Sequence, residues 1–514
     1  MMAYLSTAWA ALALLGSVIP VAYADGILAG PTIMTSLGSF RLTKSVKSAC
    51  LDLSETYPAQ VLYPNSTDYI AEAKIYWDVR ADLDPYCIFL PNSADDVADA
   101  VRKVVAVGAQ FAVRGGGHMN YPGSNNIEGG VLIALEKLQD IKVNNDTVEL
   151  GPGLRWYQVY NALEPYGRIT LGGRLKTIGV PGLTLIGGFH YFINKYGFVM
   201  DQVVSYDVVL GSGVQVTANA TSHRDLFWAL KGGANNLGIV TKFVLKTLDI
   251  PQVSSTIQEW DQSAIPAFIK GVTDLTLHED PQPIGAGGIF TITYNVTTKK
   301  ATASLLGLQE GVSNPPSQFV NFTSIPGPVK IHNVTTAAQW ASTLDSPLQM
   351  FRVMFSHHTI LPIPEVINEI YQAWLASVKS ISDVEGLYPT FVLNVVPKGA
   401  AHIGKTNGIG NLWGLDDSRS WLIWQFSTGW SLQQDDLRVQ SWSRELSTTL
   451  HEKYKALGIT SEFLYMGDAG EWQDPFQGFP AENVKKFKDV RAQYDPEQVF
   501  SRLNWGGFKA GPSV

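Results

Sequence analysis

Short apolar strands alternate with helical segments between residues 86 and 248. Apolar residues at helical spacing follow Ser93, which with Asp95 and Asp96 forms an N-cap and an acidic first turn. A hairpin is expected around Gly211-Ser212-Gly213. The expected strands are 86–90, 110–113, 131–135, 203–210, 214–217 and 238–248, and the expected helices follow Ser93 and span 155–163 and 224–231.

The pattern changes near Pro251. Residues 252–465 have more aromatic residues and longer polar gaps, which predicts a second domain built on a broad antiparallel sheet with helices on one face. We interpret its tryptophans at 413, 421, 424 and 430 as core rather than as a substrate platform. The expected divisions are a signal peptide (1–24), an N-terminal segment (25–80), a cofactor domain (81–251), a substrate domain (252–465) and a C-terminal segment (466–514) that returns to the cofactor domain.

The N-terminus indicates export. No charged side chain occurs before Asp25, and an apolar run at 8–19 is followed by Ala22-Tyr23-Ala24, a small-x-small cleavage pattern. An uncleaved membrane anchor is the alternative, although the apolar run is short for a membrane span. In an oxidising compartment a disulfide between Cys50 and Cys87 is favoured over two free thiols. Six sequons could carry glycans, at Asn65, Asn145, Asn219, Asn295, Asn321 and Asn333.

The overall charge narrows the range of partners. The chain has 46 acidic and 38 basic residues among 514, for a net charge of −8. This balance argues against nucleic acid or an anionic membrane surface as the main partner. The 45% hydrophobic content is that of a globular protein and excludes disorder. We expect a secreted protein, soluble after signal cleavage and monomeric, that acts on a small molecule.

Glycine-rich junctions are the sharpest chemical signal. Arg114-Gly115-Gly116-Gly117-His118 follows a strand, and three further glycine tracts lie at 151–153, 179–188 and 232–240. Successive glycine amides can converge on an anion, and glycine allows a ligand to approach the backbone closely. A surface turn explains the first tract alone equally well. Four tracts together suit a long cofactor whose pyrophosphate rests on backbone amides.

These motifs resemble those of the berberine-bridge-enzyme-like oxidases of the vanillyl-alcohol-oxidase superfamily, in particular secreted fungal FAD-linked oxidoreductases. The resemblance rests on Pro91, 114–118, 151–156, 179–188, 195–197 with Asp201, and 225–240, and at the C-terminus on Tyr465, 473–475, 494–496, 499–500 and 506–509. It implies an α+β fold in which a PCMH-type FAD-binding domain of two α+β subdomains joins a substrate domain with an antiparallel sheet covered by helices.

The resemblance also implies how FAD is held. A ring nitrogen of His118 would bond covalently to the flavin 8α carbon. Many relatives add a second bond through a cysteine, but the matching position is Leu175, so a single covalent bond is expected. Pro181 and Ile186 stand where the family often has glycine. The other implied cofactor contacts are Arg114, Gly115, Gly116, Gly117, Met119, Gly153, Gly179, Val180, Gly182, Thr184, Gly187, Gly188, Gly238, Ile239 and Val240.

The catalytic base is harder to assign, because the usual Tyr-x-Asn-Tyr of the family reads Tyr465-Met466-Gly467-Asp468. Asp468 and Tyr465 are candidates, and so are Asn120, where plant relatives have tyrosine, and His190. A solvated loop carboxylate is the other interpretation of Asp468, and a core histidine that of His190. His357-His358 is a weaker candidate, and adjacent histidines on a strand point apart, so no metal site is expected.

The expected activity is hydride transfer from a specialised metabolite to covalently bound FAD, with dioxygen reoxidising the flavin to give hydrogen peroxide. A carbohydrate oxidase has the same chemistry and stays open. A flavin-dependent cyclase without net redox change is a third possibility. A flavin-free secreted binding module is the non-enzymatic alternative.

Overall fold

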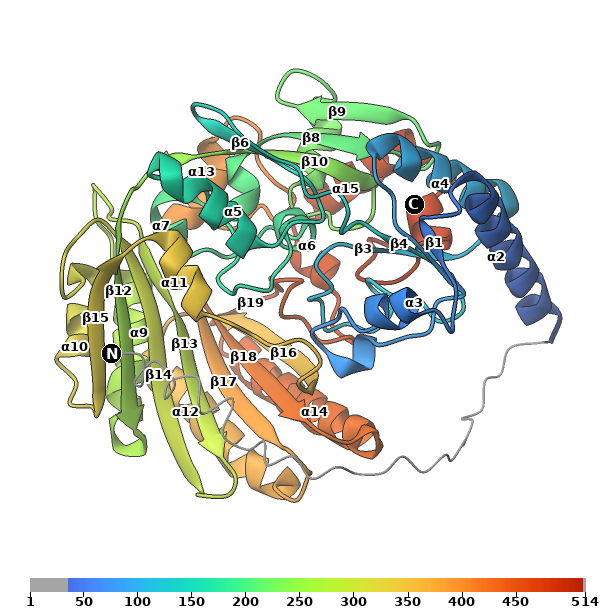
Figure 1. Cartoon of the computed structure of the whole chain (residues 1–514). Coiled ribbons are helices and arrows are strands. Elements are labelled where there is room, and N and C mark those ends of the chain that lie inside the picture. Colours follow the sequence, from blue (N-terminus) through green and yellow to red (C-terminus); the bar gives the residue numbers. More distant parts are fainter. Residues whose placement is uncertain (1–35, 512–514) are drawn as a thin grey trace.

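The computed structural model describes residues 36–511, with side chains from Lys44 onward. The expected signal peptide therefore lies outside the described residues. Three main β-sheets with flanking helices form the molecule (Figure 1). Two smaller sheets carry the glycine-rich tracts, and a large third sheet follows them in the chain. This is an α+β arrangement.

The first sheet contains β1 (Val61–Leu62), β2 (Cys87–Phe89), β4 (Val131–Ala134) and β3 (Phe111–Arg114), in that spatial order. Strands β2, β4 and β3 are parallel, so the chain crosses over through α4 (Ala94–Val107), which packs with α2 (Ser36–Thr56) beside the sheet (Figure 1). The Ser93 hydroxyl accepts the Asp96 amide at 3.1 Å, and Gly108 ends α4 at φ 65°. The predicted cap is confirmed.

The second sheet is antiparallel and contains β5 (Ile141–Val143), β6 (Thr147–Leu150), β10 (Ile239–Lys246), β8 (Val203–Val209) and β9 (Gln215–Asn219). The predicted β8–β9 hairpin and the helices α5 (Trp156–Leu163) and α8 (Arg224–Leu230) are present. The strand expected at 238–248 is interrupted. The Thr247 amide still donates to the Asp146 carbonyl, in register with β6, and beyond this residue β11 (Leu248–Asp249) pairs with β7 (Arg168–Ile169) instead.

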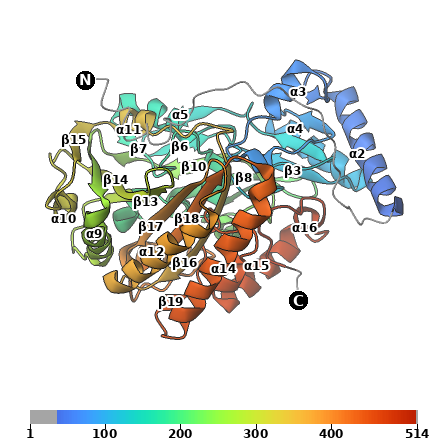
Figure 2. The same cartoon turned by 90° about the horizontal axis from the view of Figure 1, so that it is seen from below.

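The third sheet contains β15 (Val329–Thr335), β12 (Val253–Asp261), β14 (Lys300–Glu310), β13 (Ala286–Asn295), β17 (Tyr388–Val396), β18 (Trp421–Trp430), β16 (Arg352–Ile360) and β19 (Thr460–Ser461). All of its pairings are antiparallel. Helices α9 (Ile265–Leu277), α12 (Pro364–Val378) and α14 (Asp436–Lys455) cover its outer face (Figure 2). The inner face of the third sheet faces the glycine-rich part of the chain.

The C-terminal segment packs against the first two sheets. After α15 (Ala481–Tyr494) and α16 (Val499–Arg502), the Leu503 carbonyl accepts the Phe111 amide at 3.0 Å. The Asn236 side chain donates to the Phe508 carbonyl at 3.0 Å. The remaining helices are α3 (Thr67–Glu72), α6 (Val180–Leu185), α7 (Ile193–Tyr196), α10 (Val320–Thr323), α11 (Ala337–Thr343) and α13 (Lys398–Thr406). Single 3-10 turns occur at Val79–Ala81, Glu164–Tyr166, Val199–Gln202, Gln262–Ala264, Ser317–Phe319, Lys379–Ile381, Gln433–Asp435 and Pro475–Gly478.

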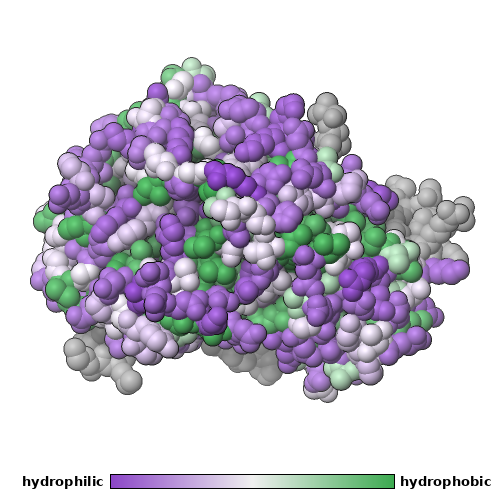
Figure 3. Space-filling model, turned by 90° about the horizontal axis from the view of Figure 1, so that it is seen from above, coloured by the Kyte–Doolittle hydropathy of each residue, from purple (hydrophilic) through white to green (hydrophobic). Residues whose placement is uncertain are grey.

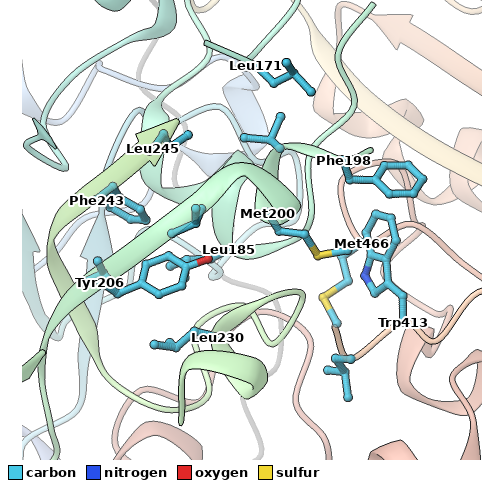
Figure 4. Packing of buried hydrophobic residues seen from close by; sticks show 14 of the residues in the cluster. Leu171, Leu185, Phe198, Met200, Tyr206, Leu230, Phe243, Leu245, Trp413 and Met466 are labelled. Carbon is cyan, nitrogen blue, oxygen red and sulfur yellow. The ribbon is translucent and has the colours of Figure 1, made fainter. Parts of the chain in front are cut away.

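The tryptophans expected in the core are there, apart from the half-buried Trp421. Trp413 lies in the core behind the second sheet, with its ring centroid 4.8 Å from that of Phe198 and with Met466 nearby (Figure 4). Cys50 of α2 and Cys87 of β2 form the expected disulfide, which ties the N-terminal helix to the first sheet. Hydrophilic and hydrophobic residues are interspersed over the face in Figure 3. Within residues 36–511, no helix is both long enough and apolar enough to cross a bilayer.

Candidate active site

A cavity of about 560 Å³ lies between the glycine-rich turns and the inner face of the third sheet. One wall comes from residues 115–117, 178–179, 181–183 and 238–240, together with His118 and Met119. The opposite wall is side chains of β12, β14, β13, β17, β18 and β16. The loop at 465–468 also lines the cavity. The cavity therefore joins the expected cofactor region to the expected substrate region.

Two glycine turns form the first wall because their backbones touch. A Cβ added at Gly116 would lie 2.5 Å from the Gly179 Cα, and a Cβ at Gly179 would lie 2.6 Å from the Gly116 Cα. Gly117 has φ +66°, and a Cβ there would lie 2.2 Å from the Ile75 carbonyl oxygen. No other residue fits these positions without moving the backbone.

The first turn has the unpaired donors that a diphosphate needs. Among the described residues, the amide groups of residues 115–119 donate to no other group, although residues 115–119 line the cavity wall. Unpaired backbone amides inside a protein are rare, and a run of them forms a concave anion site. This part of the structure fits the diphosphate of a dinucleotide cofactor.

Arg114, the residue before the glycine turn at 115–117, does not line the cavity but holds this turn in place. Its buried guanidinium contacts the Glu72 and Glu136 carboxylates, the latter at 2.8 Å, and donates to the Glu72 carbonyl at 2.7 Å. Burial and a hydrogen bond that protonated Glu72 donates to Glu136 raise the pKa of Glu72 to about 7. The two carboxylates thus balance one arginine, and the strand that leads into the glycine turn is held in place.

His118 lines the cavity and is held by two contacts. Its ring stacks on Trp77 at 4.8 Å between centroids, and its Nε2 lies 3.0 Å from the Thr177 hydroxyl. That hydroxyl donates to the Ser346 carbonyl at 3.1 Å, so its oxygen accepts from the His118 Nε2–H. Nδ1 is then the nitrogen with the lone pair. Burial and the charge of Arg155 lower the pKa of His118 to about 3, so the imidazole is neutral and nucleophilic.

Asp468, which also lines the cavity, belongs to a polar network. The Asn394 amide donates to the Asp468 carboxylate at 3.1 Å and to the Gln425 side-chain oxygen at 3.2 Å. The Asn394 oxygen accepts from Arg174 at 3.0 Å. Burial raises the pKa of Asp468 to about 6, against the charge of Arg174. A carboxylate with this pKa is suited to take a proton near neutral pH.

Tyr465 stands beside Asp468, and His357 holds both in place. The Tyr465 amide donates to His357 Nε2 at 2.9 Å, and His357 Nδ1–H donates to the Asp468 carbonyl at 2.9 Å. Burial lowers the pKa of His357 to about 4, which keeps the neutral form that both bonds require. Gln473 adds a bond from its side-chain NH₂ to the His357 carbonyl at 2.7 Å. Burial and the Asp468 charge raise the pKa of Tyr465.

The structure separates the four catalytic candidates. Asp468 and Tyr465 line the cavity, whereas Asn120 and His190 do not. Asn120 is buried, and its carbonyl accepts from Arg80 at 2.8 Å. His190 is a buried histidine whose Nδ1 accepts the Phe192 amide at 3.1 Å, and burial lowers its pKa to about 3. Neither residue lines the cavity, so this geometry gives no support to the catalytic role expected of it.

Some of the residues expected to contact the cofactor line the cavity, and others do not. Gly153, Gly187 and Gly188 pack against protein, with Gly187 against the Trp413 ring and Gly188 against Val199. These glycines serve close packing, and the contact expected of them is not seen in the cavity wall. Arg114, Val180 and Thr184 are buried and likewise outside the lining. The expected residues in the lining are Gly115, Gly116, Gly117, His118, Met119, Gly179, Gly182, Gly238, Ile239 and Val240. Leu175, Pro181 and Ile186 line the cavity too.

Sequence reasoning missed several side chains of the site. Trp77, Arg174, Glu259, Asn394 and Gln425 all line the cavity and come from separate segments. Glu259, Asn394 and Gln425 lie on the strands β12, β17 and β18, and a charged or amide side chain at a buried or half-buried strand position was the available signal. Trp77 and Arg174 lie in loops, where the sequence pattern gave no such signal.

Comparisons with known proteins agree with this geometry. Residues 85–219 match the model of an FAD binding domain. The chain is 30% identical to the FAD-dependent monooxygenase prx3 of Penicillium roqueforti over 487 residues, which cover 90% of this chain and 93% of that protein. It is 31% identical to the FAD-dependent monooxygenase macF of Penicillium terrestre over 528 residues, covering 98% of this chain and 96% of that protein.

Two solved structures share the fold. The wild-type berberine-bridge-enzyme-like protein 1 of Physcomitrella patens matches with a TM-score of 0.70, at 19% identity, over 90% of this chain and 99% of that chain. The chain belongs to the berberine-bridge-enzyme-like FAD-linked oxidoreductases. A glucooligosaccharide oxidase of Acremonium strictum, described with a 6-S-cysteinyl, 8α-N1-histidyl FAD, matches with a TM-score of 0.71, at 20% identity, over 88% of this chain and 97% of that chain.

As a member of this family, the protein is an FAD-dependent oxidoreductase. The unpaired amides of residues 115–119 and the glycine wall around Gly179 would provide the backbone contacts for the cofactor. FAD, when bound, accepts a hydride and passes electrons on. The side chains of the third sheet and the loop at 465–468 form the rest of the cavity wall.

Proposed function

We propose that this protein is an oxidase that converts a C–H/O–H pair of a small organic substrate into a carbonyl, with dioxygen as the electron acceptor. The substrate loses a hydride and a hydroxyl proton, and dioxygen takes up two electrons and two protons to become hydrogen peroxide. Asp468 receives the hydroxyl proton. The observation that carries the proposal is the carboxylate of Asp468, facing the same cavity as the glycine wall and His118.

The cavity wall favours a specialised metabolite over a simple sugar. Aromatic side chains line much of it, from Trp77, Phe189, Phe351, Phe355 and Tyr388. Flat or aliphatic parts of a substrate bury well against such rings. Two relatives named as fungal FAD-dependent monooxygenases support this choice, and their names add oxygen insertion as an outcome to be tested.

A carbohydrate oxidase is the second candidate, and one observation favours it. The hydroxyls of Thr291, Thr293, Thr302, Ser304 and Thr390 lie on the cavity side of the third sheet. Rows of hydroxyl groups suit a polyhydroxylated ligand. Hydrogen peroxide release from oligosaccharides, and not from aromatic or terpenoid alcohols, would support this candidate.

We propose that His118 holds the flavin by one covalent bond through Nδ1. The Thr177–Ser346 relay places the proton on Nε2, and burial keeps the ring neutral. Leu175 stands at the position of the second, cysteinyl attachment of many relatives, and both cysteines of the chain are in the Cys50–Cys87 disulfide. In dilute surroundings a covalent tether prevents loss of the cofactor by mass action.

Acid precipitation of the purified yellow protein tests the cofactor proposal. We expect the flavin absorption to stay in the pellet for the wild type and to move to the supernatant, or to be absent, for His118→Ala. His190→Ala is the matched control, because His190 is buried outside the cavity and should keep the flavin in the pellet. Wild-type flavin in the supernatant would contradict the tether. Correctly folded protein without flavin would overturn the oxidase proposal.

We propose that the protein is exported and glycosylated. The uncharged start and the Ala22-Tyr23-Ala24 pattern support export. Five of the six sequon asparagines are exposed, at Asn65, Asn145, Asn295, Asn321 and Asn333, and Asn219 is half-buried. Peptide-N-glycosidase treatment of protein from the culture medium should lower its apparent mass, and an unchanged mass would contradict glycosylation.

A further inference from the structure

Glu259 is a cavity carboxylate that the proposed reaction does not use. It lies on β12, half-buried, with its neighbours Gln258 and Trp260 facing the opposite side of the sheet. Its carboxylate makes no hydrogen bond or ion pair with any described residue. Lys330, which pairs with the adjacent Gln258, donates instead to the Thr323 carbonyl. Desolvation without a partner raises the pKa of Glu259.

A register row connects Glu259 with the catalytic end. The directly paired positions are Glu259 with Ser304, Ser304 with Thr291, Thr291 with Val392, Val392 with Gln425, and Gln425 with His357. Paired residues share a face, so the row crosses six strands on the cavity side. Asn394, which binds Asp468, lies two residues beyond Val392 on the same face.

The distance between the two ends of this row sets the length of a substrate that could contact both. Three strand spacings of ~4.8 Å separate β12 from β17, which places Glu259 roughly 14 Å across the sheet from the Asn394 backbone. The side chains between them are the hydroxyls of Ser304 and Thr291, whose side chains bond to no other described residue. A ligand that reaches both ends needs an elongated body and a distal group.

The charge of Glu259 determines which chemical group at the far end of the ligand would bind there. At the catalytic end Arg174 stands near Asp468, whereas no cation among residues 44–511 forms an ion pair with Glu259. A partly desolvated carboxylate is stabilised by a cation that donates hydrogen bonds, and an apolar or anionic end would leave it unpaired. This preference applies while the carboxylate is ionised.

We propose that Glu259 forms a distal subsite that binds the protonated amino group of an elongated substrate whose reacting carbon lies at Asp468. The inference rests on the proposed oxidase function, because it assumes that the substrate occupies the inner face of the sheet. Ser304 and Thr291 contact the body of the substrate between the two ends.

The test uses the flavin-loaded protein and a synthetic series of para-alkoxybenzyl alcohols of graded chain length. Each tail ends in an ammonium, a methyl or a carboxylate group. Binding is measured by the perturbation of the flavin absorption and by calorimetry, neither of which requires turnover. We expect an ammonium probe of suitable length to bind roughly tenfold more tightly than its methyl partner, the size of one charge-assisted hydrogen bond.

The variants make the test specific. Glu259→Gln keeps the shape of the side chain and should abolish the ammonium preference, and Glu259→Lys should transfer the preference to the carboxylate tail. Asp261→Asn is the matched control. Asp261 is an exposed carboxylate two residues along the same strand and outside the cavity lining. The Asp261→Asn variant should therefore keep the preference for the ammonium probe over the methyl probe.

Two failures are distinguishable. Ammonium and methyl probes that bind equally to the wild type, or probes that do not bind at all, overturn the distal subsite while a bound flavin and peroxide release leave the oxidase proposal standing. A preference that persists in Glu259→Gln also overturns it. Protein that folds without flavin contradicts the proposed function itself.

Discussion

The environment of Asp468 sets the pH range in which its carboxylate can accept a proton. The side chain is hydrogen-bonded by Asn394 and faces the cavity, and burial raises its pKa to about 6. The base must be ionised to accept a proton, so activity is present above this pKa and is lost as the pH falls through it. The relevant window is therefore mildly acidic.

The Asp468→Asn variant tests this role. We expect kcat/KM to fall about 10²- to 10⁴-fold, the usual contribution of a positioned base. The acid limb near pH ~6 should disappear from the remaining activity. Asp489→Asn, an exposed carboxylate paired with Lys485, should leave both rate and profile unchanged. An unaltered acid limb in Asp468→Asn would assign that limb to another group.

At the scale of elements, the loop that bears Tyr465 and Asp468 is held against β16 by one histidine. His357 bonds to both ends of the loop through its two ring nitrogens, and Gln473 braces the same strand. His357 touches neither the cavity wall nor the expected substrate position, so it is a positioning residue.

His357→Phe should loosen the loop without removing the flavin. We expect kcat to fall about tenfold or more, because small misplacement of a base is costly. The acid limb of the pH profile should move, since the environment of Asp468 changes. Acid-precipitable flavin should be unchanged. His190→Gln removes an equally buried histidine outside the cavity and should affect activity little. A normal pH profile in His357→Phe would mean that the clamp serves stability alone.

At the scale of the whole molecule, one buried arginine joins four parts of the chain. Arg80 pairs with Asp78 at 3.0 Å and with Glu471 at 2.6 Å, and donates to the carbonyls of Asn120 and Val353. These partners belong to the N-terminal segment, the glycine-rich part, β16 and the C-terminal segment. The cavity lies between the parts that Arg80 holds together.

Arg80→Met should destabilise the whole protein. It leaves the fully buried Asp78 carboxylate without its cation, and breaking a buried pair in this way costs about 3–5 kcal/mol. Denaturant unfolding of the flavin-loaded protein measures the loss. Lys270→Met, which removes an exposed i,i+4 pair with Asp274, should change the free energy of unfolding by less than ~0.5 kcal/mol. A small loss for Arg80→Met would mean that Asp78 is relieved by protonation or water.

The local elements and the cofactor wall could be predicted because they depend on nearby residues. The cap at Ser93, the β8–β9 hairpin and the glycine turn before His118 follow from contacts within a few positions. Glycine also marks where backbones touch, although sequence does not say whether the neighbour is a cofactor or, as for Gly187, a tryptophan.

The proton-handling end could not be read in this way. Arg174 and Asn394 are 220 residues apart, and Asn394 and Asp468 are 74 apart. Their meeting depends on how the third sheet packs on the glycine-rich part, and the same packing buries His190 without making it part of the cavity lining. By itself the sequence determined the strands, the caps and the glycine turns, since short-range geometry dictates them. Only the tertiary structure decided which carboxylates face the cavity and what pKa burial gives them.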